Sequence, residues 1–89
     1  MPARIEIFST SFCRHCVAAR EFLDARNIEY VDNRLDLMPL ERDEMIRRCG
    51  LKSVPQIFID GRHVGGYEQL VALQNSGDLD RLLGKRSQI

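Results

Sequence analysis

Two cysteines separated by two residues, Cys13 and Cys16, lie where one kind of sequence pattern gives way to another. Residues 4–8 read as a strand, because polar and apolar side chains alternate and Ile5 and Ile7 are β-branched. Residues 17–26 read as a helix, with apolar side chains at helical spacing, namely Val17, Ala18, Phe22 and Ala25. Cys13 is therefore predicted at a helix N-terminus, where unpaired backbone N–H groups and the helix dipole favour a thiolate. Cys16 follows one turn later on the same side, close enough to form a disulfide. This arrangement predicts a redox site.

The length and charge of the chain narrow the classes of protein to which it can belong. Its 89 residues suffice for one domain, which we expect to span 1–89. Because 13 Lys and Arg balance 13 Asp and Glu, we expect no nucleic-acid partner and no anionic membrane partner. No apolar run approaches the roughly 20 residues of a membrane span, and the first residues contain no signal-peptide core. Three cysteines, an odd number, argue against a secreted disulfide framework, so we expect a soluble cytoplasmic protein.

The remainder of the chain predicts three further strands and three further helices, separated by turn residues. The expected strands are 28–35, 56–59 and 62–64, with Asp60-Gly61 as a two-residue hairpin turn between the last two. The expected helices are 39–49, 67–76 and 78–84. The first of them has an apolar stripe of Leu40, Met45, Ile46 and Cys49 and ends before Gly50.

This order of elements predicts the topology of the sheet. A crossover helix joins the first two strands, so they should be parallel with a right-handed connection, whereas the last two strands form an antiparallel hairpin. The predicted fold class is therefore α/β, with a four-stranded mixed sheet in the order 2-1-3-4 and helices on both faces. That is the minimal thioredoxin-like fold.

Four motifs, in this order, resemble those of the glutaredoxin family. They are the Cys-x-x-Cys after the first strand, Ser53-Val54-Pro55 before the third, the Asp60-Gly61 hairpin, and Gly65-Gly66 followed by Tyr67-Glu68 at a helix start. The resemblance covers nearly the whole chain. It implies a glutathione-dependent oxidoreductase that reduces protein disulfides and protein–glutathione mixed disulfides. Glutathione would then be the co-substrate, disulfide-containing or glutathionylated proteins the partners, and the chain a monomer.

The resemblance also implies a role for individual residues. Cys13 would be the nucleophile and Cys16 the resolving thiol. Pro55 would be a cis proline that leaves the Val54 backbone free to pair with the peptide part of glutathione. Arg42 and Lys52 match positions that reach the glycine carboxylate, and the helix start would take the γ-glutamyl carboxylate, with Glu68 accepting from its ammonium group. The implied glutathione-binding set is Thr10, His15, Arg42, Lys52, Ser53, Val54, Pro55, Gly66, Tyr67 and Glu68.

The chain departs from the family pattern near the cysteines. Where the family commonly has Pro and Tyr, this sequence has Arg14 and His15, and Thr10 stands where the family often has Lys. We favour a role for His15 in stabilising the nucleophilic thiolate over an ordinary solvated side chain, because imidazole changes its charge near neutral pH. Outside this region, His63 is expected to be structural or solvated, and Cys49 a half-buried filler.

Two readings that involve a metal compete with the dithiol reading. A zinc site would need four ligands, and the candidates beyond the cysteine pair, Cys49, His15 and His63, lack the second paired spacing of a zinc ribbon, so no metal is expected. Some members of the family, however, carry a [2Fe–2S] cluster between two protomers. Each protomer gives its first active-site cysteine, and two glutathiones complete the four thiolates. A proline after the nucleophile disfavours such clusters in the family, and this chain has Arg14 there. A glutathione-ligated cluster carrier is therefore the alternative function.

Overall fold

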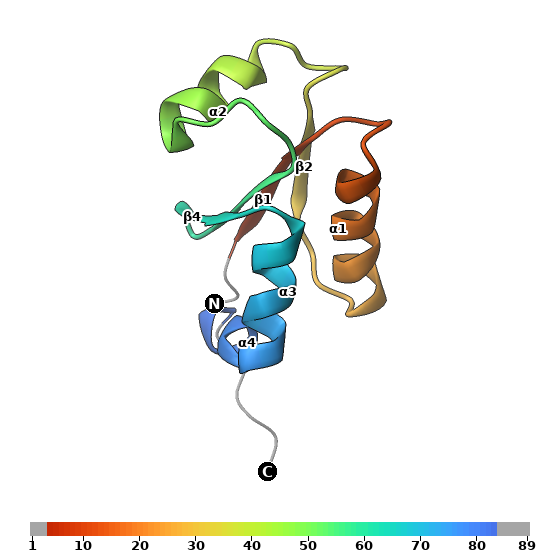
Figure 1. Ribbon diagram of the computed structural model, residues 1–89, viewed down its shortest axis with the longest axis vertical. Coiled ribbons are helices and arrows are strands. Elements are labelled where there is room, and N and C mark those ends of the chain that lie inside the picture. The colour runs from red at the N-terminus through yellow and green to blue at the C-terminus, as the bar shows by residue number, and fades with distance from the viewer. Residues whose placement is uncertain (1–3, 84–89) are drawn as a thin grey trace.

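The computed structural model describes residues 4–83 and contains a four-stranded mixed sheet with helices on both faces (Figure 1). The strand order is β2-β1-β3-β4; β1 is parallel to β2 and antiparallel to β3, and β3 is antiparallel to β4. This confirms the predicted thioredoxin-like arrangement. The elements in chain order are β1 (Ile5–Ser9), α1 (Arg14–Ala25), β2 (Val31–Arg34), α2 (Glu41–Cys49), β3 (Gln56–Ile59), β4 (Arg62–Gly65), α3 (Tyr67–Ser76) and α4 (Asp78–Leu82).

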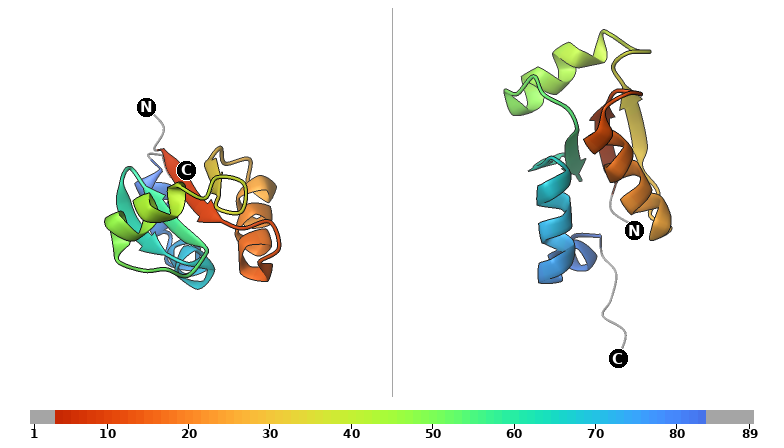
Figure 2. Two further views of the ribbon diagram at one scale, coloured as in Figure 1. Left: turned by 90° about the horizontal axis from the view of Figure 1, so that it is seen from above. Right: turned by 45° about the vertical axis from the view of Figure 1, so that its right-hand side comes forward.

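One face of the sheet is covered by α1, α3 and α4, and Figures 1 and 2 show α1 and α3 side by side there. Alternate residues of the two central strands point toward these helices, as the two-residue period of a strand requires. The buried residues that make up this core are Ile5, Ile7, Ala19, Leu23, Ile57, Ile59, Leu70, Leu79 and Leu83. Their burial fixes the position of α1, and with it the position of the two cysteines at its start.

The opposite face of the sheet is covered by α2. Here Phe8 and Phe58 meet edge to face, with ring centroids 5.6 Å apart, and Met45 packs into the same cluster. The guanidinium of Arg48 lies 4.2 Å from the centroid of the Phe58 ring and forms a 3.0 Å ion pair with Glu6 of β1. Together these contacts attach α2 to the central strands.

The buried side of α1 differs from the apolar stripe predicted from the sequence. The fully buried residues are Cys16, Ala19 and Leu23, whereas Val17 is 37% exposed and Ala25 is also exposed. The helix begins at Arg14, and the residues at positions 16, 19 and 23 share its inner side. The structure therefore turns Cys16 into the core, a placement that a reading by hydrophobicity alone overlooked.

Several predicted boundaries need correction. The strand expected over 28–35 is limited to Val31–Arg34, the stretch that is paired with β1. The helix expected from Pro39 begins at Glu41, and Leu40, placed in its apolar stripe, is 85% exposed in the preceding turn. The helix predicted over 78–84 ends at Leu82, and position 84 lies outside the described residues.

Other predictions are confirmed residue by residue. β3 and α3 have the expected bounds, and Gly50 ends α2 in the left-handed conformation. Asp60 and Gly61 both have positive φ, 52° and 80°, which matches the two-residue hairpin turn expected between β3 and β4. The Val54–Pro55 peptide bond is cis, as predicted.

Candidate functional site

Cys13 and Cys16 lie where β1 leads into α1. Cys13 is the N-cap of the helix and is half-buried, while Cys16 is completely buried one turn further along. The two residues come within 3.2 Å of each other, and both are free thiols. The Thr10 backbone N–H donates to the Cys16 sulfur at 3.5 Å. The two cysteines are therefore close enough for a disulfide to form between them.

The two thiols differ in acidity. Burial by itself raises the pKa of Cys13, but hydrogen bonds from the Cys16 side chain and from the backbone N–H groups of Cys16 and His15, together with the charge of Arg20, bring it below its ordinary value. Burial raises the pKa of Cys16 to about 11, even though the Thr10 amide acts in the opposite direction. At neutral pH, Cys13 is therefore the thiol that more readily becomes a nucleophilic thiolate, and Cys16 keeps its proton.

A groove of about 480 Å³ runs beside this pair, and we call it the Pro55 groove. The Cys13 sulfur lies 3.8 Å from the Val54 carbonyl oxygen in its wall, within reach of a weak S–H hydrogen bond. The residues that line it are His15, Leu51, Ser53, Val54, Pro55, Gln56, His63, Val64, Gly65, Gly66, Tyr67, Glu68 and Gln69. Seven residues that the sequence predicted to bind glutathione thus meet in one groove: His15, Ser53, Val54, Pro55, Gly66, Tyr67 and Glu68.

Three residues of the predicted glutathione-binding set lie outside the lining of the Pro55 groove. Thr10 instead contacts the Cys16 sulfur through its amide. The guanidinium of Arg42 donates to the carbonyl oxygen of Lys52 at 3.0 Å, so α2 holds the loop that leads to Ser53. Arg42 and Lys52 are both exposed, and this bond places the Arg42 guanidinium at the backbone one residue before Ser53, which lines the groove.

The start of α3 presents backbone groups to the Pro55 groove. The Gly66 N–H is already occupied, because it donates to the Gln69 side-chain oxygen at 2.8 Å. The amides of Tyr67 and Glu68 follow in the first turn, where helix geometry leaves N–H groups without intrahelical partners. A Cβ added to Gly65 would come within 2.9 Å of the Gln69 side chain, and its φ is +124°, so a glycine fits this position.

Sequence reasoning missed a polar contact inside the Pro55 groove. Gln56 is buried, its side-chain nitrogen donates to the Ser53 carbonyl at 3.1 Å, and its oxygen lies 2.7 Å from the His63 imidazole. His63, which we expected to be structural or solvated, thus bonds across the hairpin and also lines the groove. A signal was present in the sequence, since Gln56 is the one polar residue in an otherwise apolar strand.

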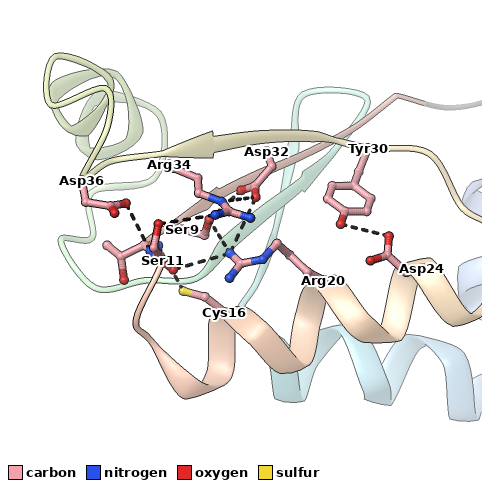
Figure 3. A network of polar contacts seen from close by, with 10 residues as sticks. Ser9, Ser11, Cys16, Arg20, Asp24, Tyr30, Asp32, Arg34 and Asp36 are labelled. Atoms are coloured by element: carbon pink, nitrogen blue, oxygen red, sulfur yellow. Dashed lines mark hydrogen bonds and ion pairs between the residues drawn. The ribbon is translucent and has the colours of Figure 1, made fainter.

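Figure 3 shows a second polar network, which includes Cys16. The guanidinium of Arg20 donates to Ser9 Oγ at 3.0 Å and to the Thr10 carbonyl at 3.5 Å, and it lies 3.6 Å from Asp32 of β2. Ser9 Oγ in turn donates to Asp32 at 2.6 Å. None of these contacts was expected from the sequence, because they join α1, the end of β1 and β2, which only the fold brings together.

Within residues 4–83, no cluster of three or more His, Cys, Asp or Glu side chains has the arrangement of a metal site. In the same part of the chain, none of the helices has the length and apolar character needed to cross a membrane.

The sequence of the chain matches those of known proteins of one family. The family model described as Glutaredoxin matches residues 5–64. Glutaredoxin 3 of Escherichia coli strain K12 is 40% identical over 81 residues, which cover 91% of this chain and 98% of that protein. The similarity therefore extends over almost the full length of both chains.

Solved structures show the same fold. The solution structure of the dithiolic glutaredoxin 2-C-Grx1 from Trypanosoma brucei brucei matches with a TM-score of 0.81 and 34% identity, over 91% of this chain and 87% of that one. The crystal structure of a buckwheat glutaredoxin–glutathione complex matches with a TM-score of 0.82 and 24% identity, over 92% and 77%. With a paired-cysteine site at the start of α1, this chain belongs to the glutaredoxin family of thiol–disulfide oxidoreductases.

Proposed function

We propose that this glutaredoxin uses glutathione to reduce protein disulfides and protein–glutathione mixed disulfides. The observation that carries the proposal is the pair of unequal thiols next to the Pro55 groove. Cys13 has a lowered pKa and access to the groove, whereas Cys16 is buried with its pKa raised to about 11. A nucleophile and a resolving thiol need this difference in pKa, because the nucleophile must react as a thiolate while the resolving thiol stays protonated until the mixed disulfide has formed.

With a glutathionylated protein, the Cys13 thiolate attacks the sulfur of the glutathione half of the mixed disulfide. The protein thiolate leaves and takes up a proton, and glutathione is now joined to Cys13. A second glutathione thiolate then attacks that sulfur, which releases glutathione disulfide and restores the Cys13 thiolate. With a protein disulfide, the Cys13 thiolate attacks one sulfur, the other sulfur leaves as a thiolate and takes up a proton, and the substrate is joined to Cys13. Cys16 then loses its proton, attacks the Cys13 sulfur and releases the second substrate thiol, so that the Cys13–Cys16 disulfide forms. Two glutathiones then reduce the Cys13–Cys16 disulfide.

The Pro55 groove has the chemistry to bind glutathione. The Val54 backbone beside Cys13 would pair with the peptide groups of the ligand in the manner of an added strand. The amides of Tyr67 and Glu68 would take the γ-glutamyl carboxylate, and the Glu68 carboxylate its ammonium. Lys52 and Arg42 would supply positive charge for the glycine carboxylate of glutathione. Ser53 follows Lys52 in the chain and connects it to Val54. Buckwheat glutaredoxin, which shares this fold, was solved as a glutathione complex.

The test compares Cys13→Ser with Cys16→Ser in the turnover of a glutathionylated peptide by glutathione. Cys13→Ser should have no activity above the uncatalysed exchange, because no other thiol has the same position at the groove. Cys16→Ser should keep this activity but lose the reduction of protein disulfides that requires two cysteines. Substantial activity in Cys13→Ser would refute the assignment of the nucleophile. Equal turnover when glutathione is replaced by 2-mercaptoethanol at the same concentration would refute the dependence on glutathione.

A further inference from the structure

A compact charged cluster lies next to Cys16, its residues are not among those that line the Pro55 groove, and the catalytic steps above do not use it. Its centre is the Arg20 side chain, 11% exposed, which extends from α1 toward Asp32 of β2, 16% exposed (Figure 3). Asp32 also accepts from Arg34 Nε at 2.9 Å and from Ser9 Oγ at 2.6 Å. One carboxylate thus faces two guanidinium groups.

Thr10 joins the cluster to the redox pair. The Thr10 backbone N–H donates to the Cys16 sulfur at 3.5 Å, while the Thr10 carbonyl accepts from Arg20 Nη1 at the same distance. Arg20 also follows Cys16 by four positions in α1, so the two side chains leave the helix on the same side. Burial and hydrogen bonding have the larger effects on both thiols, but the positive charge of Arg20 adds to the lowering of the Cys13 pKa and opposes the rise of the Cys16 pKa.

We propose that Arg20 is a positioning residue whose charge, partly neutralised by Asp32, sets how oxidising the Cys13–Cys16 disulfide is. A positive charge near the sulfurs stabilises the thiolate of the reduced pair and has no such effect on the uncharged disulfide. Arg20 therefore favours the dithiol, and Asp32 opposes it by offsetting that charge. The two residues act in opposite directions on the same equilibrium. This inference rests on the proposed function in one respect, that Cys13 and Cys16 alternate between dithiol and disulfide.

The equilibrium can be measured without glutathione, using 2-mercaptoethanol and its disulfide as the redox buffer. In the forward direction both cysteine thiols lose their protons, and two electrons pass to the S–S bond of the small disulfide. One S–S bond forms in the protein, one breaks in the reagent, and two molecules of 2-mercaptoethanol carry away the protons. The position of this equilibrium does not depend on recognition of glutathione. A failure of this inference and a failure of the proposed function are therefore distinguishable.

Four variants resolve the roles of the two charges. Arg20→Gln should shift the equilibrium toward the disulfide by about threefold to tenfold, the scale of one partly screened charge near the pair. Arg20→Lys should keep most of the wild-type position, since it retains the charge. Asp32→Asn should shift the equilibrium the other way, toward the dithiol, because Arg20 and Arg34 lose their counter-charge. Arg26→Gln is the matched control, because Arg26 lies at the exposed C-terminal end of α1 and bonds to the Phe22 carbonyl; it should leave the equilibrium unchanged.

Unfolding by urea, measured on the same proteins, distinguishes this proposal from a purely structural cluster. If Arg20→Gln and Asp32→Asn both lower stability and leave the equilibrium within error of wild type, the cluster only holds α1 against β2, and the proposal is wrong. It is equally wrong if both variants shift the equilibrium in the same direction, or if Arg26→Gln shifts it as far as Arg20→Gln does. Should Arg20→Gln fail to fold, Arg20→Lys and Asp32→Asn still decide the question, because the proposal requires a small shift in the first and a shift toward the dithiol in the second.

Discussion

The Cys13 sulfur lies 3.8 Å from the carbonyl oxygen of Val54, although the two residues are 41 positions apart in the chain. The first belongs to the start of α1 and the second to the loop before β3. Any group joined to Cys13 through a disulfide therefore lies next to the Val54 backbone and the Pro55 groove. Cys16, in contrast, is fully buried beneath the turn. This difference in position leads to the first prediction.

Alkylation of the reduced protein should discriminate between the two thiols. The thiolate is the reactive form, so the cysteine with the lower pKa reacts at lower pH. Cys13, whose pKa is lowered, should be labelled by iodoacetamide at about neutral pH, whereas Cys16, with a pKa of about 11, should react only in strongly alkaline solution. Peptide mass spectrometry across a pH series measures both and separates them from Cys49. Equal labelling of Cys13 and Cys16 at neutral pH would contradict the asymmetry.

Lys52→Ala should weaken substrate binding more than catalysis. Lys52 is exposed in the loop that leads to Ser53, and its ammonium group takes no part in the exchange between sulfurs. We expect KM for a glutathionylated peptide to rise severalfold and kcat to stay within about twofold, as for a contact that ground and transition states share. Arg42→Ala should have a larger effect, since Arg42 also holds the Lys52 carbonyl at 3.0 Å.

The matched control for these charge deletions is Arg47→Ala. Arg47 lies on the exposed side of α2, with its side chain 71% exposed and paired with Glu44 three residues earlier. It should leave KM unchanged. If Lys52→Ala also leaves KM unchanged, Lys52 is an ordinary surface cation and the implied carboxylate contact is absent.

Local patterns were sufficient to predict much of the fold. The bounds of β3 and α3 and the turn at Asp60-Gly61 follow from alternation, turn residues and helix periodicity over fewer than about a dozen residues. The sheet order follows from the crossover rule. The buried side of α1 did not follow, because a cysteine at position 16 and an alanine at position 19 carry a weaker hydrophobic signal than Val17 and Phe22.

Contacts between distant segments were the part of the site that the sequence did not reveal. The Arg20–Asp32 pair depends on the parallel pairing of β1 with β2, and the Gln56–His63 bond on the register of the hairpin. Nothing in the residues around Arg20 indicates that its partner lies twelve positions ahead, on a strand. The motifs in contact with the Pro55 groove, by comparison, could be recognised from the resemblance to glutaredoxins.

Replacing Gln56 by Met should both destabilise the protein and weaken substrate binding in the Pro55 groove. Methionine has a similar volume but cannot donate to the Ser53 carbonyl or face the His63 imidazole. Losing these buried bonds should lower the free energy of unfolding by about 1–3 kcal/mol. Urea unfolding measures this, and steady-state kinetics should show a raised KM because Ser53 borders the groove. Gln74→Met, on α3 and outside the lining of the groove, is the control and should change neither quantity appreciably.

The Glu6–Arg48 pair should make stability depend on pH in the acid range. The hydrogen bond from Arg48 lowers the pKa of Glu6, despite partial burial, so the folded state favours the carboxylate. The lowered pKa stabilises the folded protein at pH values above the pKa of Glu6 in the unfolded chain, about 4.3. That stability is lost as the pH falls through the lower pKa of Glu6 in the folded protein. Urea unfolding of wild type and Glu6→Gln should therefore differ at pH 7 and converge in acid. Exposed Glu21→Gln is the control, and a difference that persists unchanged into acid would contradict the linkage.

The last prediction concerns how His15 acts on the nucleophile. The sequence suggested a role for its imidazole, but the His15 group that lowers the pKa of Cys13 is the backbone N–H. The imidazole lies toward Tyr67, with the two ring centroids 6.5 Å apart, along the Pro55 groove. His15→Phe keeps the amide and a planar ring, so we expect it to leave most of the lowering intact.

The measurement is the iodoacetamide alkylation rate of Cys13 against pH in wild type, His15→Phe and Arg20→Gln. The His15→Phe midpoint should stay within a few tenths of a pH unit of wild type, because hydrogen bonds from amides do not depend on the ring. Arg20→Gln should move the midpoint upward, since the Arg20 charge does contribute to the lowering. If His15→Phe instead raises the midpoint by about one unit or more, the imidazolium stabilises the thiolate, and the interpretation from the sequence is correct. If the midpoint is unchanged but KM for the glutathionylated peptide rises, the His15 ring contributes to substrate binding in the groove, and the His15 backbone N–H stabilises the Cys13 thiolate.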